Sequence, residues 1–140
     1  PAFPAGAGPD YVNAAAWLEA PWDPQTALGV LHRIEAQMGR ERVQRWGQRT
    51  LDLDLLACDD IVLPDRQTHK MWRELPLEAQ IGRTPEQLIL PHPRLQDRAF
   101  VLVPLADVAP NWVHPLIGKP VRALLEALPE RDRAEVRRLQ

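Results

Sequence analysis

The stretch LDLDLLA, residues 51–57, sets the expectation for both the fold and the chemistry. Its alternation predicts an extended strand with Leu51, Leu53 and Leu55 on one face and Asp52 and Asp54 on the other. Neighbouring side chains on one strand face lie about 7 Å apart, so both carboxylates can reach one divalent ion or hold a pair of ions. Because Mg²⁺ prefers oxygen ligands, the pattern indicates a magnesium site.

An arginine-dense loop, RERVQRWGQRT at residues 40–50, comes directly before this strand. Arginine side chains bind phosphate oxygens in bidentate fashion, and a metal-holding acidic pair beside such a loop is what phosphoryl transfer requires. The alternative is a solvated strand face with weak Asp–Arg surface pairs. The sequence lacks the Gly-x-x-x-x-Gly-Lys-Ser/Thr loop that would supply a different nucleotide site.

A second cluster is LPHPRLQDRAF, residues 90–100. His92 lies between two prolines that stiffen the backbone, and Arg98 and Phe100 follow. A histidine and an arginine on a rigid loop can bind a phosphate. The alternative is a turn histidine that caps a neighbouring backbone group.

A third cluster is PDYVN, residues 9–13, which begins an extended segment expected over residues 11–20. Tyr11 and Asn13 share one side of it, and an aromatic ring beside an amide suits a flat heterocycle. The alternative is an edge strand that packs its own tyrosine.

The other expected elements follow from local signals. Asp23-Pro24 predicts a helix start and Gly39 a left-handed end, which gives a helix over 24–38. Residues 98–109 are apolar on most sides and fit either a strand or a helix. The remaining expectations are a turn at 59–60, a returning strand at 61–63, a helical turn or two within 72–81, a short strand at 88–90, a last amphipathic helix from Val121 to Leu128, and a frayed charged tail over 130–140.

Composition limits the classes of function. The chain has 140 residues, 45% apolar and 26% charged, as expected for one globular domain. A net charge of -2 argues against a general nucleic-acid coat, and no apolar stretch approaches the ~20 residues of a membrane span. The single cysteine, Cys58, favours a reducing compartment. Because the chain starts at Pro1, we expect that its natural N-terminus is missing.

Taken together, PDYVNAA, IEAQMGR, RWGQRTLDLDLL, LPHPRLQDRAFVLVPLADVAP and GKPV resemble the 6-hydroxymethyl-7,8-dihydropterin pyrophosphokinase family from about Pro9 to Leu128. The resemblance implies transfer of pyrophosphate from ATP to the hydroxymethyl group of the pterin, with release of AMP, in folate biosynthesis. The alternative is a non-catalytic nucleotide-binding or interaction fragment of a folate-pathway protein.

The resemblance also implies roles for individual residues. Asp52 and Asp54 match the ligands of two Mg²⁺ ions, and the catalytic set adds Arg40 and Arg49. The residues expected to bind ATP are Glu35, Arg42, Arg45, Leu55, His92 and Arg98. Those expected to bind the pterin are Tyr11, Asn13, Trp46 and Phe100.

The implied fold is an α/β (α+β) ferredoxin-like three-layer sandwich, with a mostly antiparallel sheet and helices on both faces. Residues 1–140 would form one pyrophosphokinase domain that lacks the family's N-terminal strand-helix-strand segment, with an insertion at 65–87. The expected partners are ATP and the pterin, without nucleic acid or membrane. The expected state is a cytoplasmic monomer or weak dimer.

Overall fold

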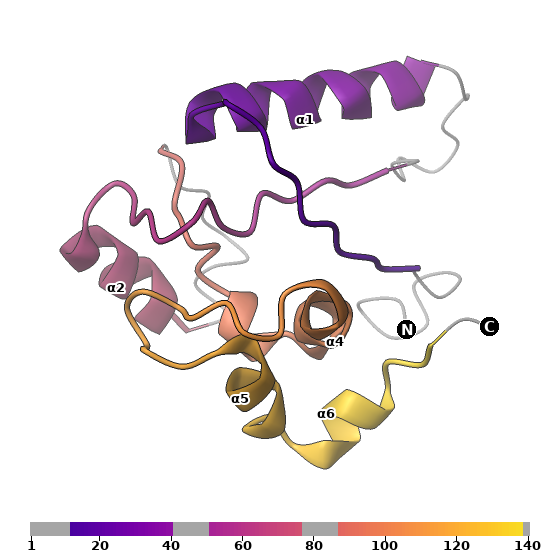
Figure 1. The fold of residues 1–140 in the computed structure, drawn as a ribbon, viewed down its shortest axis with the longest axis vertical. Helices are drawn as coiled ribbons and strands as arrows, with labels where there is room; N and C mark the ends of the chain where they lie inside the picture. The colour runs from indigo at the N-terminus through magenta and orange to yellow at the C-terminus, as the bar shows by residue number, and fades with distance from the viewer. Residues whose placement is uncertain (1–11, 41–50, 77–86, 139–140) are drawn as a thin grey trace.

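The computed structural model describes residues 12–40, 51–76 and 87–138. Figure 1 shows one long helix, α1, along one side of the molecule and a group of shorter helices on the other. Two extended stretches, residues 12–22 and 51–58, run between them. The helices are α1 (Pro24–Arg40), α2 (Arg66–Glu74), the 3₁₀ turn η1 (Leu95–Asp97), α4 (Ala99–Val108), α5 (Val121–Glu126) and α6 (Glu130–Ala134).

Helix α1 begins where the sequence predicted. The backbone N–H of Thr26 donates to Oδ1 of Asp23 at 2.7 Å, which makes Asp23 the N-cap residue ahead of Pro24. The predicted end was wrong by two residues, because the helix continues through Gly39 to Arg40. Gly39 therefore lies within the helix and does not adopt the left-handed cap conformation.

The stretch that follows the arginine-dense loop is extended, and its alternation is confirmed. Leu51, Leu53 and Leu55 are half-buried, whereas Asp52 and Asp54 are exposed. The stretch thus presents its carboxylates on one side and its leucines towards the protein.

Two hydrogen bonds fix this stretch between the two groups of helices. The backbone N–H of Leu53 donates to Oε2 of Glu35 on α1 at 2.7 Å. On the other side, the backbone N–H of His92 donates to the carbonyl of Leu56 at 2.7 Å. Asp54 lies between these two points and is therefore held from both sides, and Asp52 lies one residue before the first point.

The antiparallel sheet of the predicted sandwich is not seen in the described residues. Their β-pairing consists of two isolated antiparallel bridges, Leu63 with Leu90 and Val113 with Pro120. The expected return of residues 61–63 along the strand before the turn is wrong. Leu63 instead exchanges backbone hydrogen bonds of 2.9 and 3.2 Å with Leu90. The turn at 59–60 is confirmed, with the N–H of Ile61 donating to the carbonyl of Cys58 at 3.0 Å.

Helix α2 lies earlier in the sequence than predicted. Asp65 is its N-cap and accepts the backbone N–H of Thr68 at 2.7 Å. His69 and Trp72 are buried on its inner face. The described part of the expected 65–87 insertion, residues 65–76, thus docks on the protein through the buried side chains of His69 and Trp72.

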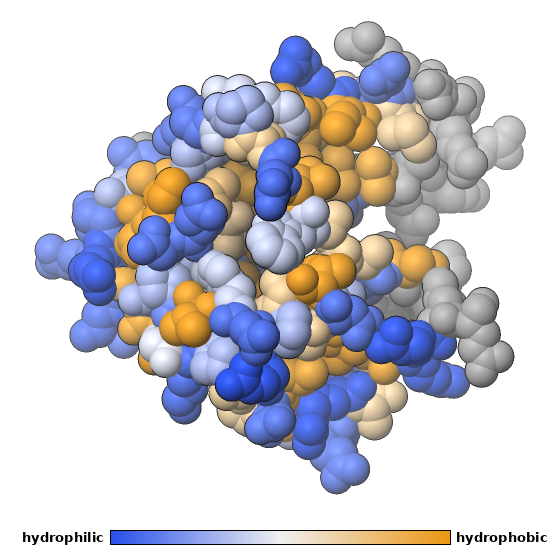
Figure 2. All heavy atoms as spheres, in the orientation of Figure 1, coloured by the Kyte–Doolittle hydropathy of each residue, from blue (hydrophilic) through white to orange (hydrophobic). Residues whose placement is uncertain are grey.

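The apolar core lies in the C-terminal half, where α4 packs against α5 and α6. Leu95, Leu102, Val121 and Leu124 are buried there, each contributing about 2 kcal/mol. Leu56 packs against this cluster and so joins the aspartate-bearing stretch to the core. Figure 2 shows apolar side chains gathered around α4 and along the side of α1 that faces it.

The described C-terminal part of the chain, from residue 98 onwards, contains three helices. The ambiguous segment 98–109 is the helix α4, which continues through Pro104 although that residue cannot donate to the carbonyl of Phe100. The helix from Val121 is confirmed as α5, but it is not the last helix. The expected fraying over residues 130–138 is wrong, because α6 forms there and Arg138 pairs with Asp107 at 2.9 Å.

None of the helices in the described part of the chain is both long enough and apolar enough to cross a bilayer.

Candidate phosphate and metal site

The site is built around His92, which lies in the proline-flanked loop after Leu90. Its Nδ1 accepts the backbone N–H of Arg94 at 3.2 Å. In the neutral ring the proton must then lie on Nε2, which leaves Nε2–H as the donor. Burial lowers the pKa of His92 and nearby Arg98 lowers it further, while Asp54 partly offsets both. At neutral pH the ring is therefore an uncharged hydrogen-bond donor.

Arg98 supplies the positive charge of the site. It is the N-cap residue of α4, and its guanidinium carbon lies 5.5 Å from the centre of the Phe100 ring, at cation–π distance. Burial lowers the pKa of Arg98, and the Asp54 carboxylate acts in the opposite direction. An arginine nevertheless stays protonated at neutral pH.

Asp54 thus interacts electrostatically with both His92 and Arg98, although the three come from two separate sequence motifs. Asp52 lies two residues away and is exposed like Asp54. The structure therefore brings the Asp54 carboxylate within electrostatic reach of a neutral donor and a guanidinium, and whether these groups bind a ligand stays a prediction. Phe100 lies against Arg98 and is 43% exposed, so its ring is accessible for stacking on a ligand.

The carboxylates fit a magnesium ion that is shared with a phosphate ligand. In the described ranges no group of three or more His, Cys, Asp or Glu side chains could enclose a metal ion. Mg²⁺ is usually held by one or two carboxylates, with water and substrate phosphate completing its shell. Asp52 and Asp54 match that donor set.

Other predicted residues have different surroundings. Glu35 accepts the N–H of Leu53, so the structure gives its carboxylate a role in holding the aspartate stretch in place. Asn13 is exposed on the extended segment 12–22, and Leu55 is half-buried. Their contacts with pterin or adenine stay predictions. Arg40 is the last residue of α1, and the remaining predicted residues, Tyr11, Arg42, Arg45, Trp46 and Arg49, lie outside the described residues.

Sequence reasoning missed two contacts behind the site. Nε2 of His69 donates to the carbonyl of Pro91 at 2.7 Å, and the guanidinium of Arg94 donates to the carbonyl of Leu75. Both contacts involve α2, and the sequence does contain a signal for its start. Asp65 is a favoured N-cap residue, three positions before Thr68. The carbonyl groups of Pro91 and Leu75 are distant in sequence from the side chains that bind them, so no local pattern predicts these hydrogen bonds.

A carboxylate beside a guanidinium and a neutral imidazole is a set of groups that suits a phosphate-bearing ligand with a divalent cation. The family model described as 7,8-dihydro-6-hydroxymethylpterin-pyrophosphokinase (HPPK) matches residues 1–110. The chain belongs to this family.

Named relatives agree with this assignment. A 2-amino-4-hydroxy-6-hydroxymethyldihydropteridine pyrophosphokinase of Synechocystis is 41% identical over 118 residues, which cover 84% of this chain and 50% of the relative. The protein of the same name from Methylorubrum extorquens is 35% identical over 130 residues, covering 93% and 66%. The folic acid synthesis protein fol1 of Schizosaccharomyces pombe is 31% identical over 121 residues, covering 86% and 14%. The chain thus spans between half and two thirds of the two bacterial relatives.

Proposed function

We propose that this chain carries the nucleotide-binding and catalytic surface of a 6-hydroxymethyl-7,8-dihydropterin pyrophosphokinase, which transfers pyrophosphate from ATP to the pterin alcohol and releases AMP. The observation that carries the proposal is the 2.7 Å hydrogen bond from the backbone N–H of His92 to the carbonyl of Leu56, which holds the loop of His92 and Arg98 beside the aspartate stretch. These residues occupy the two motifs that resemble the family most closely, and both motifs lie within the matched residues 1–110.

The proposed reaction is an in-line displacement. The hydroxymethyl oxygen of the pterin forms a bond to the β-phosphorus of ATP, and the bond from that phosphorus to the oxygen bridging to the α-phosphorus breaks. AMP leaves with the bridging oxygen, and the hydroxyl proton is released to water. No covalent intermediate with the protein is needed, so catalysis consists of positioning and charge stabilisation.

Each described residue has a role in this scheme. Nε2–H of His92 and the guanidinium of Arg98 donate to phosphate oxygens, and Phe100 stacks on the pterin. Asp52 and Asp54 hold Mg²⁺, which neutralises the charge of the phosphates when it is bound. We propose two ions, as in the resemblance. For the other residues we propose the roles that the family resemblance implies. Arg40 and Arg49 would be catalytic, Glu35, Arg42, Arg45 and Leu55 would bind ATP, and Tyr11, Asn13 and Trp46 would bind the pterin.

We also propose the fold and setting that the family resemblance implies. The two extended stretches lie between α1 and the C-terminal helices, which suits strands of a sandwich with helices on both faces (Figure 1). A single domain with an insertion at 65–87, a monomeric or weakly dimeric state and a cytoplasmic setting remain parts of the proposal.

Calorimetric titration tests the proposal. A non-hydrolysable ATP analogue is titrated with and without Mg²⁺, and the pterin follows. We expect nucleotide binding that requires Mg²⁺, then pterin binding that requires nucleotide. Release of AMP from ATP and pterin is measured in parallel.

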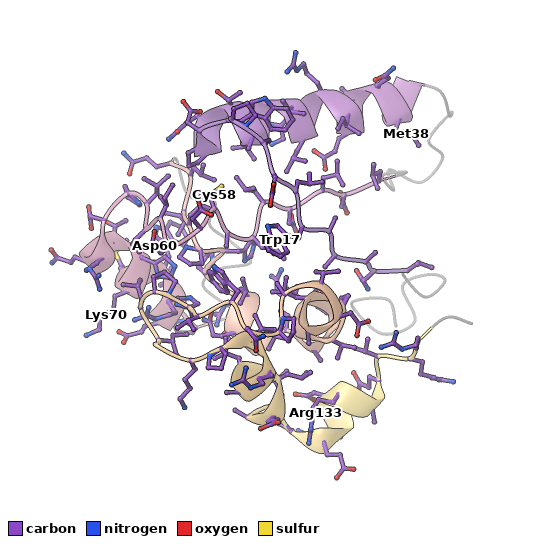
Figure 3. The ribbon with its side chains drawn as sticks, viewed as in Figure 1. Trp17, Met38, Cys58, Asp60, Lys70 and Arg133 are labelled. Atoms are coloured by element: carbon purple, nitrogen blue, oxygen red, sulfur yellow. The ribbon has the colours of Figure 1, made fainter. Side chains whose placement is uncertain are left out.

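The matched variants are Asp54→Asn and Asp60→Asn. Both replace an exposed carboxylate by an amide of the same shape, but Asp60 lies in the turn near α2 (Figure 3). Asp54→Asn should abolish Mg²⁺-dependent binding, and Asp60→Asn should leave it intact. Equal binding by both variants would defeat the metal assignment. Nucleotide binding without AMP release would favour the alternative, a non-catalytic fragment. The chain spans only 50% and 66% of the two bacterial relatives, which is consistent with that alternative.

A further inference from the structure

Helix α2 contacts the loop that carries His92 at two points. The Nε2 atom of His69 lies 2.7 Å from the carbonyl oxygen of Pro91, the residue directly before His92. The guanidinium of Arg94, two residues after His92, donates to the carbonyl of Leu75 at the C-terminal end of α2. The loop is therefore attached to α2 on both sides of His92.

The chemistry of the first contact is fixed by its partner. A carbonyl oxygen can only accept, so Nε2 of His69 carries the proton and donates. Both His69 and Pro91 are fully buried, and a hydrogen bond away from water is stronger and harder to replace than an exposed one. The ring of His114 packs edge-on against His69 at 5.8 Å and restricts its position.

The second contact involves Arg94, which is also hydrogen-bonded to His92. The backbone N–H of Arg94 donates to Nδ1 of His92, which is the bond that leaves the proton on Nε2 of His92. The Arg94 side chain also pairs with Asp97 at 2.8 Å, one residue before Arg98. A displacement of α2 would therefore change the orientation of His92 and the backbone that leads to Arg98.

We propose that α2 acts as a brace that positions His92 and Arg98 for phosphate, with His69 as the positioning residue. This inference rests on the proposed function for its consequence in nucleotide binding. It assigns a purpose to residues 65–76, which the proposed function leaves without one.

The test compares three variants at neighbouring positions. His69→Leu removes the donor, whereas His69→Gln keeps an N–H in a similar place. Lys70→Leu makes the same replacement on the exposed side of α2 (Figure 3). Each is titrated with the non-hydrolysable ATP analogue and Mg²⁺, and the imidazole signals of His92 are followed by NMR as a function of pH.

We expect His69→Leu to bind the analogue about fivefold to tenfold more weakly, the factor typical of one buried hydrogen bond. His69→Gln and Lys70→Leu should bind within about twofold of the unchanged chain, because they keep the donor. Both replacements should raise the pKa of His92, because His69 itself lowers it. The rise should be larger in His69→Leu than in His69→Gln, because a loosened loop admits water around the ring.

A folded His69→Leu variant with unchanged affinity and the same His92 pKa as His69→Gln would overturn the inference. If the unchanged chain does not bind the nucleotide, the proposed function fails, and the His92 titration alone then decides whether α2 positions the loop. If His69→Leu does not fold, Asp65→Ala replaces it, since it weakens the exposed N-cap of α2 only. That variant should weaken binding about twofold to threefold, and full affinity together with reduced helicity would refute the brace.

Discussion

His114 provides the sharpest test of the packing around α2. Its side chain is fully buried, and its Nδ1 accepts the backbone N–H groups of Leu116 and Ile117 at 3.1 and 3.2 Å. Burial lowers the pKa of His114 to about 4, and the nearby His69 and Arg73 act in the same direction. The folded protein therefore keeps this ring neutral at a pH where an unfolded chain would protonate it.

The sign and size of the effect follow from that pKa. Between an unfolded pKa of about 6.5 and the folded value of about 4, the unfolded state binds more protons, so stability falls as the pH falls. The stability that the neutral His114 ring contributes is therefore fully present above the unfolded pKa. Its total is at most about 3 kcal/mol, and lowering the pH from about 7 to about 5 should remove about 2 kcal/mol of it.

The assay is urea unfolding followed by tryptophan fluorescence at these two pH values. The matched variant is His114→Asn, whose amide oxygen can accept the same backbone N–H groups but does not titrate. The unchanged chain should lose about 2 kcal/mol more stability than the variant between pH 7 and pH 5. Equal losses in the two proteins would refute the reasoning, since His69 and His92 are present in both.

Three further predictions concern separate contacts. Glu35→Ala should lower the free energy of unfolding by about 1–2 kcal/mol in urea titrations, because the partly buried N–H of Leu53 loses its acceptor, whereas Glu35→Gln should recover most of it. Leu102→Ala should lower it by about 2–5 kcal/mol by leaving a cavity in the core, and a loss below 1 kcal/mol would contradict the packing described. Asp54→Asn should lower the pKa of His92 in NMR titrations, because the carboxylate now raises it, and an unchanged pKa would show that the two groups do not interact.

Local signals predicted the elements whose causes are local. Asp23 and Pro24 gave the start of α1, and the alternation from Leu51 to Leu55 gave the exposed aspartates. Helix α2 was misplaced because its apolar residues are few, although Asp65 marks its start. The sequence could thus have located this helix by its cap.

The failures came from interactions between distant residues. Segment 98–109 is apolar on most sides, so no periodicity distinguished helix from strand, and burial against α5 and α6 decided it. The pairing of Leu63 with Leu90 and the contact of His69 with Pro91 depend on tertiary packing that no local pattern encodes. The expectation that Asp54 and His92 serve one nucleotide site came only from the resemblance of their two motifs to those of a known family, and their electrostatic interaction was not predicted.

The location of the core has a consequence for the order of folding. Leu95, Leu102, Val121 and Leu124 are close in sequence, so their cluster can form with little loop-closure entropy. The aspartate-bearing stretch joins it through Leu56 and through the indole N–H of Trp112, which donates to the distant carbonyl of Asp59 at 2.8 Å. We expect the C-terminal helices to gain protection from hydrogen exchange first during refolding, and the carboxylates of Asp52 and Asp54 to reach their places only afterwards.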